Sequence, residues 1–277
     1  MYRILKRQRL AEGTYDFWIE APEVAQHTRP GQFLVVRVHD RGERIPLTIA
    51  DAQDDKVRIV VKAVGKTTYE LCSRKKGDEL ADVVGPLGRP SEIDRFGRVL
   101  LVGGGVGIAA IYPIARELKR VGNHVTVILG GRTAEQVIMR DEFGFADRVL
   151  ITTDDGSLGI KGVVTDAMKQ VLDSDEVDVA WAIGPTIMMK FCALLARERD
   201  LKIWTSLNPI MVDGTGMCGA CRVSVDGKIK FACVDGPEFD GRFVDWDELL
   251  KRLTIYREEE QKSLQRYLEK VGDMTWL

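Results

Sequence analysis

This chain of 277 residues has a small net charge, few histidines and no long apolar run. Its 40 Lys and Arg residues almost balance 42 Asp and Glu residues, so the net charge of −2 predicts no strong attraction to nucleic acid or to an anionic membrane. The three histidines lack the spacing of a metal site. No pair of side chains stands out as general acid and general base, so we assign no catalytic residue.

No segment predicts a membrane span or an exported protein. Residues 99–115 carry no charge, but they are fewer than the about 20 residues that a spanning helix needs, and they contain four glycines and a proline. Charges interrupt residues 1–10, which removes the apolar core of a signal peptide. The five cysteines, three of them clustered, do not predict a disulfide framework. We therefore expect a cytoplasmic protein.

The most informative stretch is residues 206–233, which contains Cys218, Cys221 and Cys233. Glycine and alanine surround the Cys-x-x-Cys pair, and a loop around a metal centre needs such residues because glycine tolerates the required dihedrals. An Asp-Gly turn at residues 226–227 separates two strand-like segments and predicts a hairpin. The hairpin would return Cys233 to the first pair.

Three thiolates leave one ligand position open, and Asp213 stands where it is needed. The pattern D-x4-C-x2-C-x11-C matches the plant-type ferredoxin spacing C-x4-C-x2-C…C, with Asp213 in place of the first cysteine. We therefore predict a 2Fe–2S cluster held by Asp213, Cys218, Cys221 and Cys233. A zinc site, a redox-active Cys-x-x-Cys and buried structural cysteines remain alternatives.

The segment N-P-I-M-V-D-G-T-G-M-C-G-A-C-R-V, residues 208–223, closely resembles the small subunit of NADH-dependent ferredoxin:NADP oxidoreductases, also described as sulfide dehydrogenase small subunits. More distantly it resembles the electron-transfer subunit of type B dihydroorotate dehydrogenases, which usually has cysteine in place of Asp213. The resemblance covers nearly the whole chain. It implies FAD, a 2Fe–2S cluster and NAD(H), with NADP(H) as an alternative nucleotide. It also implies a larger partner subunit with a second flavin and further clusters, and ferredoxin as an indirect redox partner.

The pattern along the chain predicts three units and a tail. Several short strand-like segments between turn residues predict a small β-barrel, and alternating strands and helices after it predict a doubly wound parallel sheet. The units are an FAD-binding β-barrel at 1–94, an NAD(P)-binding α/β domain at 95–206, an iron–sulfur module at 207–240 and a helical tail at 241–277. In the tail, Asp245 is expected to cap one helix, and Leu264, Leu268 and Val271 share a face of a second helix. The tail either packs on its own protein or docks a partner.

Two motifs of the first unit resemble flavin-binding motifs of the ferredoxin reductase superfamily. In residues 44–48, the forked guanidinium of Arg44 suits a pyrophosphate, and the Thr48 hydroxyl suits the flavin ring near N5. Residues 64–68 resemble a phosphate loop in which backbone amides and threonine hydroxyls cradle an anion. An ordinary strand arginine and an ordinary turn are the alternatives. The predicted flavin-binding residues are Arg44, Pro46, Leu47, Thr48, Lys62, Ala63, Val64, Gly65, Thr67 and Thr68.

A glycine-rich turn at residues 103–107 follows a predicted strand and precedes a predicted helix, where backbone amides favour phosphate. It is not a G-x-G-x-x-G fingerprint, because Ile108 interrupts it and no acidic residue closes the next strand. The ferredoxin reductase superfamily uses a similar turn. By that resemblance, the predicted nucleotide-binding residues are Gly104, Gly105, Val106, Gly107, Arg132, Thr153, Asp154, Asp155, Gly184 and Pro185. Arg132 either meets a 2′-phosphate or is a solvated surface charge.

These sites together predict an electron-transfer (diaphorase) subunit that passes electrons between NAD(H), FAD and a 2Fe–2S cluster. By resemblance, it would be the small subunit of a heterodimeric NAD(H)-dependent ferredoxin:NADP oxidoreductase that splits or merges electron pairs. One alternative is a subunit serving a dihydroorotate dehydrogenase or a sulfur or sulfide oxidoreductase. Another is a non-enzymatic module that senses redox or nucleotide state through its metal site.

Overall fold

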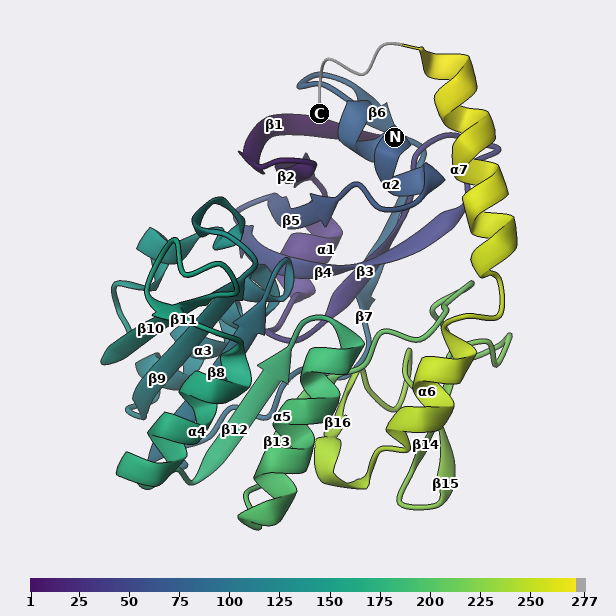
Figure 1. Ribbon diagram of the computed structural model, residues 1–277. Helices are drawn as coiled ribbons and strands as arrows, with labels where there is room; N and C mark the ends of the chain where they lie inside the picture. The colour runs from purple at the N-terminus through teal and green to yellow at the C-terminus, as the bar shows by residue number, and fades with distance from the viewer. Residues whose placement is uncertain (273–277) are drawn as a thin grey trace.

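An antiparallel barrel forms the N-terminal part of the computed structural model, which describes residues 1–272 (Figure 1). Its strand order is β6-β1-β2-β5-β4-β3-β7. The strands are β1 (Tyr2–Ala11), β2 (Thr14–Glu20), β3 (Phe33–Arg37), β4 (Arg44–Gln53), β5 (Lys56–Lys62), β6 (Glu79–Leu80) and β7 (Asp82–Leu87), with helices α1 (Pro22–His27) and α2 (Lys66–Ser73). Alternate β2 residues Tyr15, Phe17 and Ile19 are buried in the barrel core, as the two-residue period of a strand requires. The predicted barrel is confirmed.

A second sheet follows, in the order β11-β10-β9-β8-β12-β13-β16. Its parallel strands are β8 (Arg98–Gly104), β9 (His124–Gly131), β10 (Arg148–Thr153), β11 (Ile160–Lys161), β12 (Val179–Ile183) and β13 (Ile203–Ser206). Helices α3 (Gly107–Arg120), α4 (Val164–Ser174) and α5 (Thr186–Glu198) connect them. Along β8, Val99 and Leu101 share a core with α3, whereas Leu100 and Val102 share a core with α4 and α5. Helices thus cover both faces, and the predicted doubly wound sheet is confirmed.

The segment after β13 leaves this sheet and then returns to it. It forms the hairpin β14 (Arg222–Val225) and β15 (Lys228–Phe231), with Asp226 and Gly227 at the turn, as the sequence predicts. Strand β16 (Glu238–Asp240) then pairs antiparallel with β13 at the edge of the parallel sheet. The end of the predicted iron–sulfur module therefore contributes a strand to the nucleotide domain.

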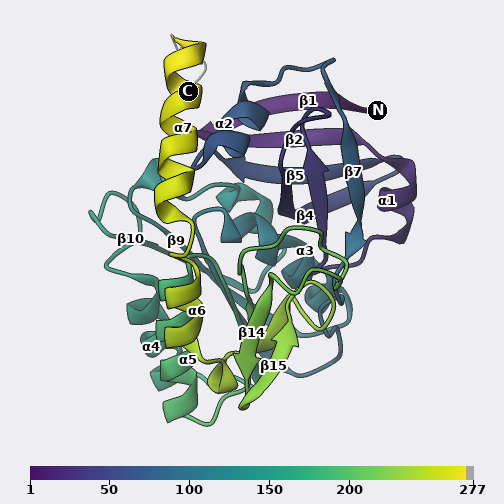
Figure 2. The same cartoon turned by 90° about the vertical axis from the view of Figure 1, so that its right-hand side faces the viewer.

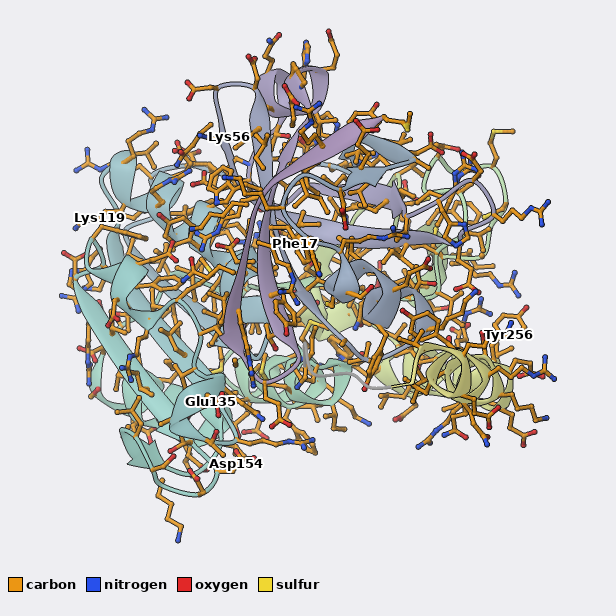
Figure 3. The ribbon with its side chains drawn as sticks, turned by 90° about the horizontal axis from the view of Figure 1, so that it is seen from above. Phe17, Lys56, Lys119, Glu135, Asp154 and Tyr256 are labelled. Carbon is orange, nitrogen blue, oxygen red and sulfur yellow. The ribbon has the colours of Figure 1, made fainter. Side chains whose placement is uncertain are left out.

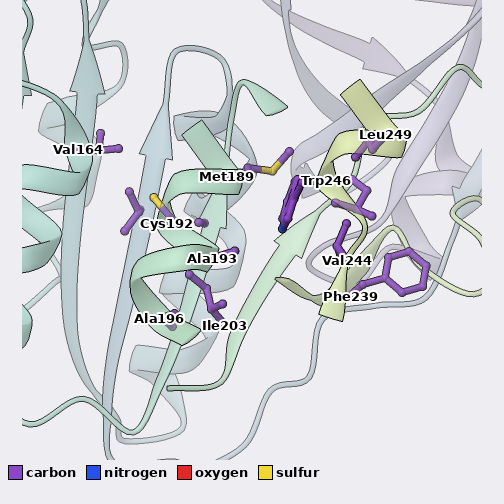
Figure 4. Close-up of a cluster of buried hydrophobic side chains, with 14 of the residues drawn as sticks. Val164, Met189, Cys192, Ala193, Ala196, Ile203, Phe239, Val244, Trp246 and Leu249 are labelled. Atoms are coloured by element: carbon purple, nitrogen blue, oxygen red, sulfur yellow. The ribbon is translucent and has the colours of Figure 1, made fainter. Parts of the chain in front are cut away.

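Two helices complete the described chain, α6 (Trp246–Arg252) and α7 (Arg257–Val271). The Asp245 carboxylate accepts a hydrogen bond of 2.9 Å from the Glu248 amide, which confirms the predicted helix cap. Trp246 and Leu249 belong to the same buried cluster as Met189 of α5, so α6 is anchored to the nucleotide domain (Figure 4). Within residues 1–272, no helix has the length and apolar character to cross a membrane.

Partly buried ion pairs join the barrel to the nucleotide domain. Arg58 on β5 lies with Nε 2.8 Å from Asp16 Oδ1 of β2 and with Nη1 2.6 Å from Glu142 Oε2 of the nucleotide domain. Arg116 on α3 lies with Nη2 2.8 Å from Asp51 Oδ1 of β4. Because buried charges are costly unless paired, these contacts fix how the two domains meet.

Replacing Arg58 by Leu should lower the free energy of unfolding by about 3 kcal/mol, because Asp16 is left as an unpaired charge in the core. Replacing Arg148 by Ala removes a solvent-exposed pair with Asp175 and should cost less than about 1 kcal/mol. Urea denaturation of both variants measures the difference. Equal losses would contradict a structural role for the buried pair.

Glu238 on β16 turns its carboxylate inward, where the linker between the two domains meets the sheet. Ser91 Oγ donates a hydrogen bond of 2.6 Å to one carboxylate oxygen, and Trp181 Nε1 donates one of 3.3 Å to the other. Burial raises the pKa of Glu238 from its ordinary value of 4.5 to about 7. The folded protein therefore favours the protonated side chain.

A group whose pKa is raised by folding stabilises the fold fully below its unfolded pKa and loses that contribution as pH rises through the folded value. The stability supplied by Glu238 should thus fall by about 2 kcal/mol between pH 4.5 and 7.5, a figure that allows for the partial exposure of the residue. Thermal unfolding of Glu238→Gln should show a flatter pH profile over this range. An unchanged profile would remove Glu238 as its source.

Candidate cofactor sites

A cavity of about 240 Å³ lies where the barrel meets the nucleotide domain. From the barrel it is lined by Pro46, Leu47 and Thr48 of β4, and from the nucleotide domain by Val106, Gly107 and Gly184. These six residues come from three predicted motifs that are far apart in the sequence. The structure therefore brings the ring end of the predicted flavin motif to the glycine-rich turn.

The glycines on the nucleotide side allow an unusually close approach of two strand ends. A Cβ at Gly107 would lie 2.1 Å from the carbonyl oxygen of Ile183, and one at Gly184 would lie 2.9 Å from the carbonyl oxygen of Gly104. Gly105 has φ +56°, a conformation that glycine adopts readily. Strands β8 and β12 are neighbours here, and β9 lies on the other side of β8. The cavity thus lies at the carboxyl ends of β8 and β12, where such sheets bind ligands.

Sequence reasoning missed one wall of this cavity. Residues 206–211, which follow β13, contribute Ser206, Leu207, Asn208, Pro209 and Met211 to the lining. The Thr186 hydroxyl at the start of α5 donates a hydrogen bond of 2.8 Å to Asn208 Oδ1 and fixes this segment. The sequence position of this segment could have predicted its role, because it follows the end of a predicted strand and leads directly into the cysteine loop.

The predicted phosphate loop is more structured than the sequence suggests. Lys66, Thr67 and Thr68 form the first turn of α2, and the amides of Val64 and Gly65 donate hydrogen bonds of 2.9 and 3.0 Å to Thr68 Oγ1. The expectation that these amides and the Thr68 hydroxyl are free to cradle an anion is therefore corrected, because they satisfy each other as a helix cap.

The remaining groups beside α2 are differently engaged. The Thr67 hydroxyl donates a hydrogen bond to the Glu43 carboxylate, and Lys66 Nζ lies 3.8 Å from Glu43 Oε1. Arg44 is exposed on β4. Among residues 1–272 its side chain has no ion pair or hydrogen bond, and the residue opposite it on β3 is another cation, Arg37. The Arg44 guanidinium is therefore available to an anion. Of the other predicted flavin residues, Lys62 ends β5, and the Ala63 amide bonds to Gly13.

Arg132, Thr153, Asp154 and Asp155 meet each other but do not line the cavity. The amides of Asp154 and Asp155 each donate a hydrogen bond of 3.2 Å to a carbonyl at the end of β9, that of Gly131 and that of Arg132. The Ser157 hydroxyl and amide hold the pKa of the Asp155 carboxyl below its ordinary value. In the view of Figure 3, Asp154 and Glu135 lie on one side of the molecule and Tyr256 of the tail lies on the other. Pro185, the remaining predicted nucleotide residue, precedes α5.

The four predicted cluster ligands form two pairs. Cys221 Sγ and Cys233 Sγ are 3.2 Å apart in the buried part of the loop, and both thiols are free. Cys218 Sγ is exposed and lies 3.3 Å from Asp213 Oδ1. Within the described residues, no three His, Cys, Asp or Glu side chains gather closely enough to hold one metal ion. Two ligand pairs match in number and type what a cluster of two irons needs, with two protein ligands at each iron.

The protonation behaviour of these residues also fits a bound cation. Hydrogen bonds from the Thr215 amide and its neighbours hold the pKa of Asp213 below its ordinary value, so the carboxylate is ionised. Burial and the adjacent Cys221 raise the pKa of the Cys233 thiol to about 12. Without a metal the Cys233 side chain is therefore a neutral thiol, and iron binding would displace its proton, because the thiolate is the form that binds metal. The residues present therefore fit a 2Fe–2S cluster.

The cluster loop also packs on the barrel. Gly214 has φ +77°, and a Cβ there would lie 3.0 Å from Val35 Cγ2 and 3.1 Å from Leu87 Cδ1. Strands β3 and β7 thus support the residue next to Asp213. Because residues 206–211 line the cavity and residue 213 belongs to the cluster loop, the two sites share one short segment of chain.

Comparison with protein families identifies two parts of the chain. Residues 208–245 match the profile described as the iron-sulfur cluster binding domain of dihydroorotate dehydrogenase B. Residues 101–193 match the profile described as the oxidoreductase NAD-binding domain. The expectations of an iron–sulfur site and a nicotinamide nucleotide domain are therefore confirmed.

Whole-chain relatives agree. The chain is 61% identical over 272 residues to the dihydroorotate dehydrogenase B (NAD(+)) electron transfer subunit homolog of Thermotoga maritima, covering 98% of this chain and 96% of the relative. It is 37% identical over 248 residues to the corresponding electron transfer subunit of Shouchella clausii, covering 85% and 94%.

Solved structures are similar to this chain as well. A chain from the structure of NADH-dependent reduced ferredoxin-NADP oxidoreductase, studied for flavin-based electron bifurcation, is 60% identical, with a TM-score of 0.92 and coverage of 97% and 98%. Phthalate dioxygenase reductase is 19% identical, with a TM-score of 0.57 and coverage of 81% and 85%, and this likeness concerns the fold alone. The chain belongs to the family of electron transfer subunits of dihydroorotate dehydrogenase B and their homologues in NADH-dependent ferredoxin-NADP oxidoreductase.

Proposed function

We propose that this protein is the electron-transfer small subunit of a heterodimeric NAD(H)-dependent ferredoxin:NADP oxidoreductase, using NAD(H), FAD and a 2Fe–2S cluster. The observation that carries the proposal is the junction of two sites on residues 206–213. These residues line the interdomain cavity and continue into the cluster loop without an intervening element. When bound, the flavin exchanges the electron pair of a nicotinamide for the single electrons of an iron–sulfur cluster.

The chain's own residues hold and shield that chemistry. Arg44 offers a forked donor to the flavin pyrophosphate and neutralises its charge. Thr48 presents a hydroxyl in the interdomain cavity, where it orients the flavin ring by a hydrogen bond. Gly104, Gly105 and Gly107 lack a Cβ, so the turn can lie close against a nicotinamide in the same cavity. The apolar walls, including Leu47 and Met211, keep water from the reacting faces.

Nucleotide and cluster are held at opposite ends of this arrangement. Arg132, Asp154 and Asp155 lie at the ends of β9 and β10 and bind the adenosine half of NAD(H). Thr153 is fully buried and supports this loop instead, because its hydroxyl donates a hydrogen bond to the Leu158 carbonyl. Asp213 and Cys218 hold one iron, and Cys221 and Cys233 hold the other. The exposed Cys218 side faces outward, so electrons leave the subunit there toward a larger partner that carries a second flavin and further clusters. The pair works in the cytoplasm, with ferredoxin as an indirect partner.

A second function within the same class is that of electron-transfer subunit to a dihydroorotate dehydrogenase. The name of the Shouchella clausii relative favours it. Asp213 favours the first function, because by resemblance the dihydroorotate dehydrogenase subunits usually carry cysteine there. Isolation of the native complex distinguishes the two, since only one partner oxidises dihydroorotate.

An anaerobic absorption spectrum of the purified protein, recorded with iron, zinc and flavin analysis, tests the proposal directly. We expect flavin bands, about two irons per chain and bleaching of the spectrum when NADH is added. Arg44→Ala should release flavin and leave the iron content unchanged, whereas Arg41→Ala, a nearby exposed arginine, should retain both. A colourless zinc protein would overturn the proposal.

Replacing Asp213 tests whether this residue binds iron or only lies beside the iron ligands in the cluster loop. Asp213→Cys should keep about two irons per chain and change the absorption spectrum and reduction potential of the cluster, because thiolate replaces carboxylate at one iron. Asp213→Ala should lower the iron content at least twofold. Asp226→Asn, at the hairpin turn of the same module, is the matched control and should alter neither property. An Asp213→Cys spectrum identical to that of the wild type would remove Asp213 from the ligand set.

A further inference from the structure

Helix α7 stands beside the barrel without being buried in it. Figures 1 and 2 show it running along the barrel next to α2, and contacts join these two helices. None of its residues is buried, and its inner face, formed by Ser263, Leu264, Tyr267 and Leu268, is only half-buried. A helix held this loosely derives little stability from packing, since amphipathic helices are normally fixed by burying their apolar face.

The space beneath the helix is a cavity of about 600 Å³. From the barrel it is lined by Glu43, which precedes β4, by Ile45 of β4 and by the start of α2, and from the tail by residues that include Ser263 and Leu264. A volume of this size is in the range of small-molecule sites. The inner face of α7 is therefore separated from the barrel by room for a ligand.

This cavity and the interdomain cavity lie along the same strand. Glu43, just before β4, and Ile45 line the outer cavity, whereas Pro46, Leu47 and Thr48 line the interdomain cavity. Arg44, which has no anion partner within the described chain, stands between the two groups. Residues 43 and 48 are about 17 Å apart at the rise of an extended strand. A dinucleotide with its ring in the inner cavity and its phosphates at Arg44 would place its second nucleoside in the outer one.

The outer cavity also has the chemistry of a nucleoside site. Ile45, which also packs against the barrel core, and Leu264 of the tail helix contribute apolar surface to the lining, which suits an aromatic base. The Glu43 carboxylate and the Ser263 hydroxyl offer hydrogen-bonding groups for a ribose diol. Glu43 is already oriented by the Thr67 hydroxyl and by Lys66. Both halves of an adenosine would thus find complementary partners.

We propose that α7 and β4 enclose the adenosine half of the flavin, so that the tail helix makes the protein select FAD over FMN. This inference rests on the flavin site proposed above. Bound adenosine fills the cavity and gives α7 the apolar contacts that it otherwise lacks. The tail is in this way a wall of the cofactor site.

Hydrogen exchange and flavin titration of the full-length protein, stripped of flavin and then reconstituted, test the proposal. FAD should bind at least tenfold more tightly than FMN, and only FAD should slow amide exchange across residues 257–271. Ser263→Trp fills the cavity and should weaken FAD binding at least tenfold, while FMN binding stays within twofold. Gln265→Trp, on the exposed face of α7, is the matched control and should behave as the wild type.

Each other outcome overturns the inference. Equal protection of α7 by FAD and FMN, or an unchanged FAD-to-FMN ratio in Ser263→Trp, would show that the helix does not contact adenosine. Protection of α7 by the larger subunit alone would make the helix a docking element instead. If Ser263→Trp does not fold, the exchange experiment on the wild type still decides. A protein that binds neither flavin would instead overturn the proposed function itself.

Discussion

The contact between strand β4 of the barrel and helix α3 of the nucleotide domain is the constraint on which the cofactor sites depend. Arg116 on α3 pairs with Asp51 on β4, and Arg58 pairs with Asp16 within the barrel and with Glu142 across the boundary. Paired charges in a partly buried interface tolerate little displacement, because separating them leaves each one desolvated and uncompensated. Strand β4 is thereby held with its flavin motif against the glycine-rich turn. If the two domains could shift relative to each other, the same residues would be present but would no longer line one cavity.

The second constraint is the short path from that cavity to the cluster loop. Residues 206–211 form a wall of the cavity, and Gly214, just beyond Asp213, packs on Val35 and Leu87 of the barrel. The cluster loop is thus supported by the domain that holds the flavin as well as by the sheet from which it emerges. Electron transfer depends steeply on the distance and orientation of the cofactors, and the protein's contribution is to fix both.

Short-range patterns predicted much of this arrangement, and long-range contacts account for the rest. The cysteine spacing, the Asp-Gly hairpin and the glycine turn each act within a few residues, and each lies where the sequence places it. The bonding of Thr68 to the Val64 and Gly65 amides was not visible, because a phosphate loop and a helix cap use the same residue types. The roles of Arg58, and of residues 206–211, depend on partners more than 20 positions away. The pattern of a single segment does not contain such contacts.

Strand β16 makes the iron–sulfur module an insertion in the nucleotide-domain sheet. Since β13 ends at Ser206 and β16 begins at Glu238, the whole cluster loop and its hairpin form an excursion between two adjacent strands of one sheet. Both ends of the excursion are tied into the same hydrogen-bonded edge. Such a module is anchored at both ends, unlike a domain that hangs on a single flexible linker. The position of the cluster loop is thus tied to one edge of the nucleotide sheet, so its distance from a partner follows from how the whole subunit docks.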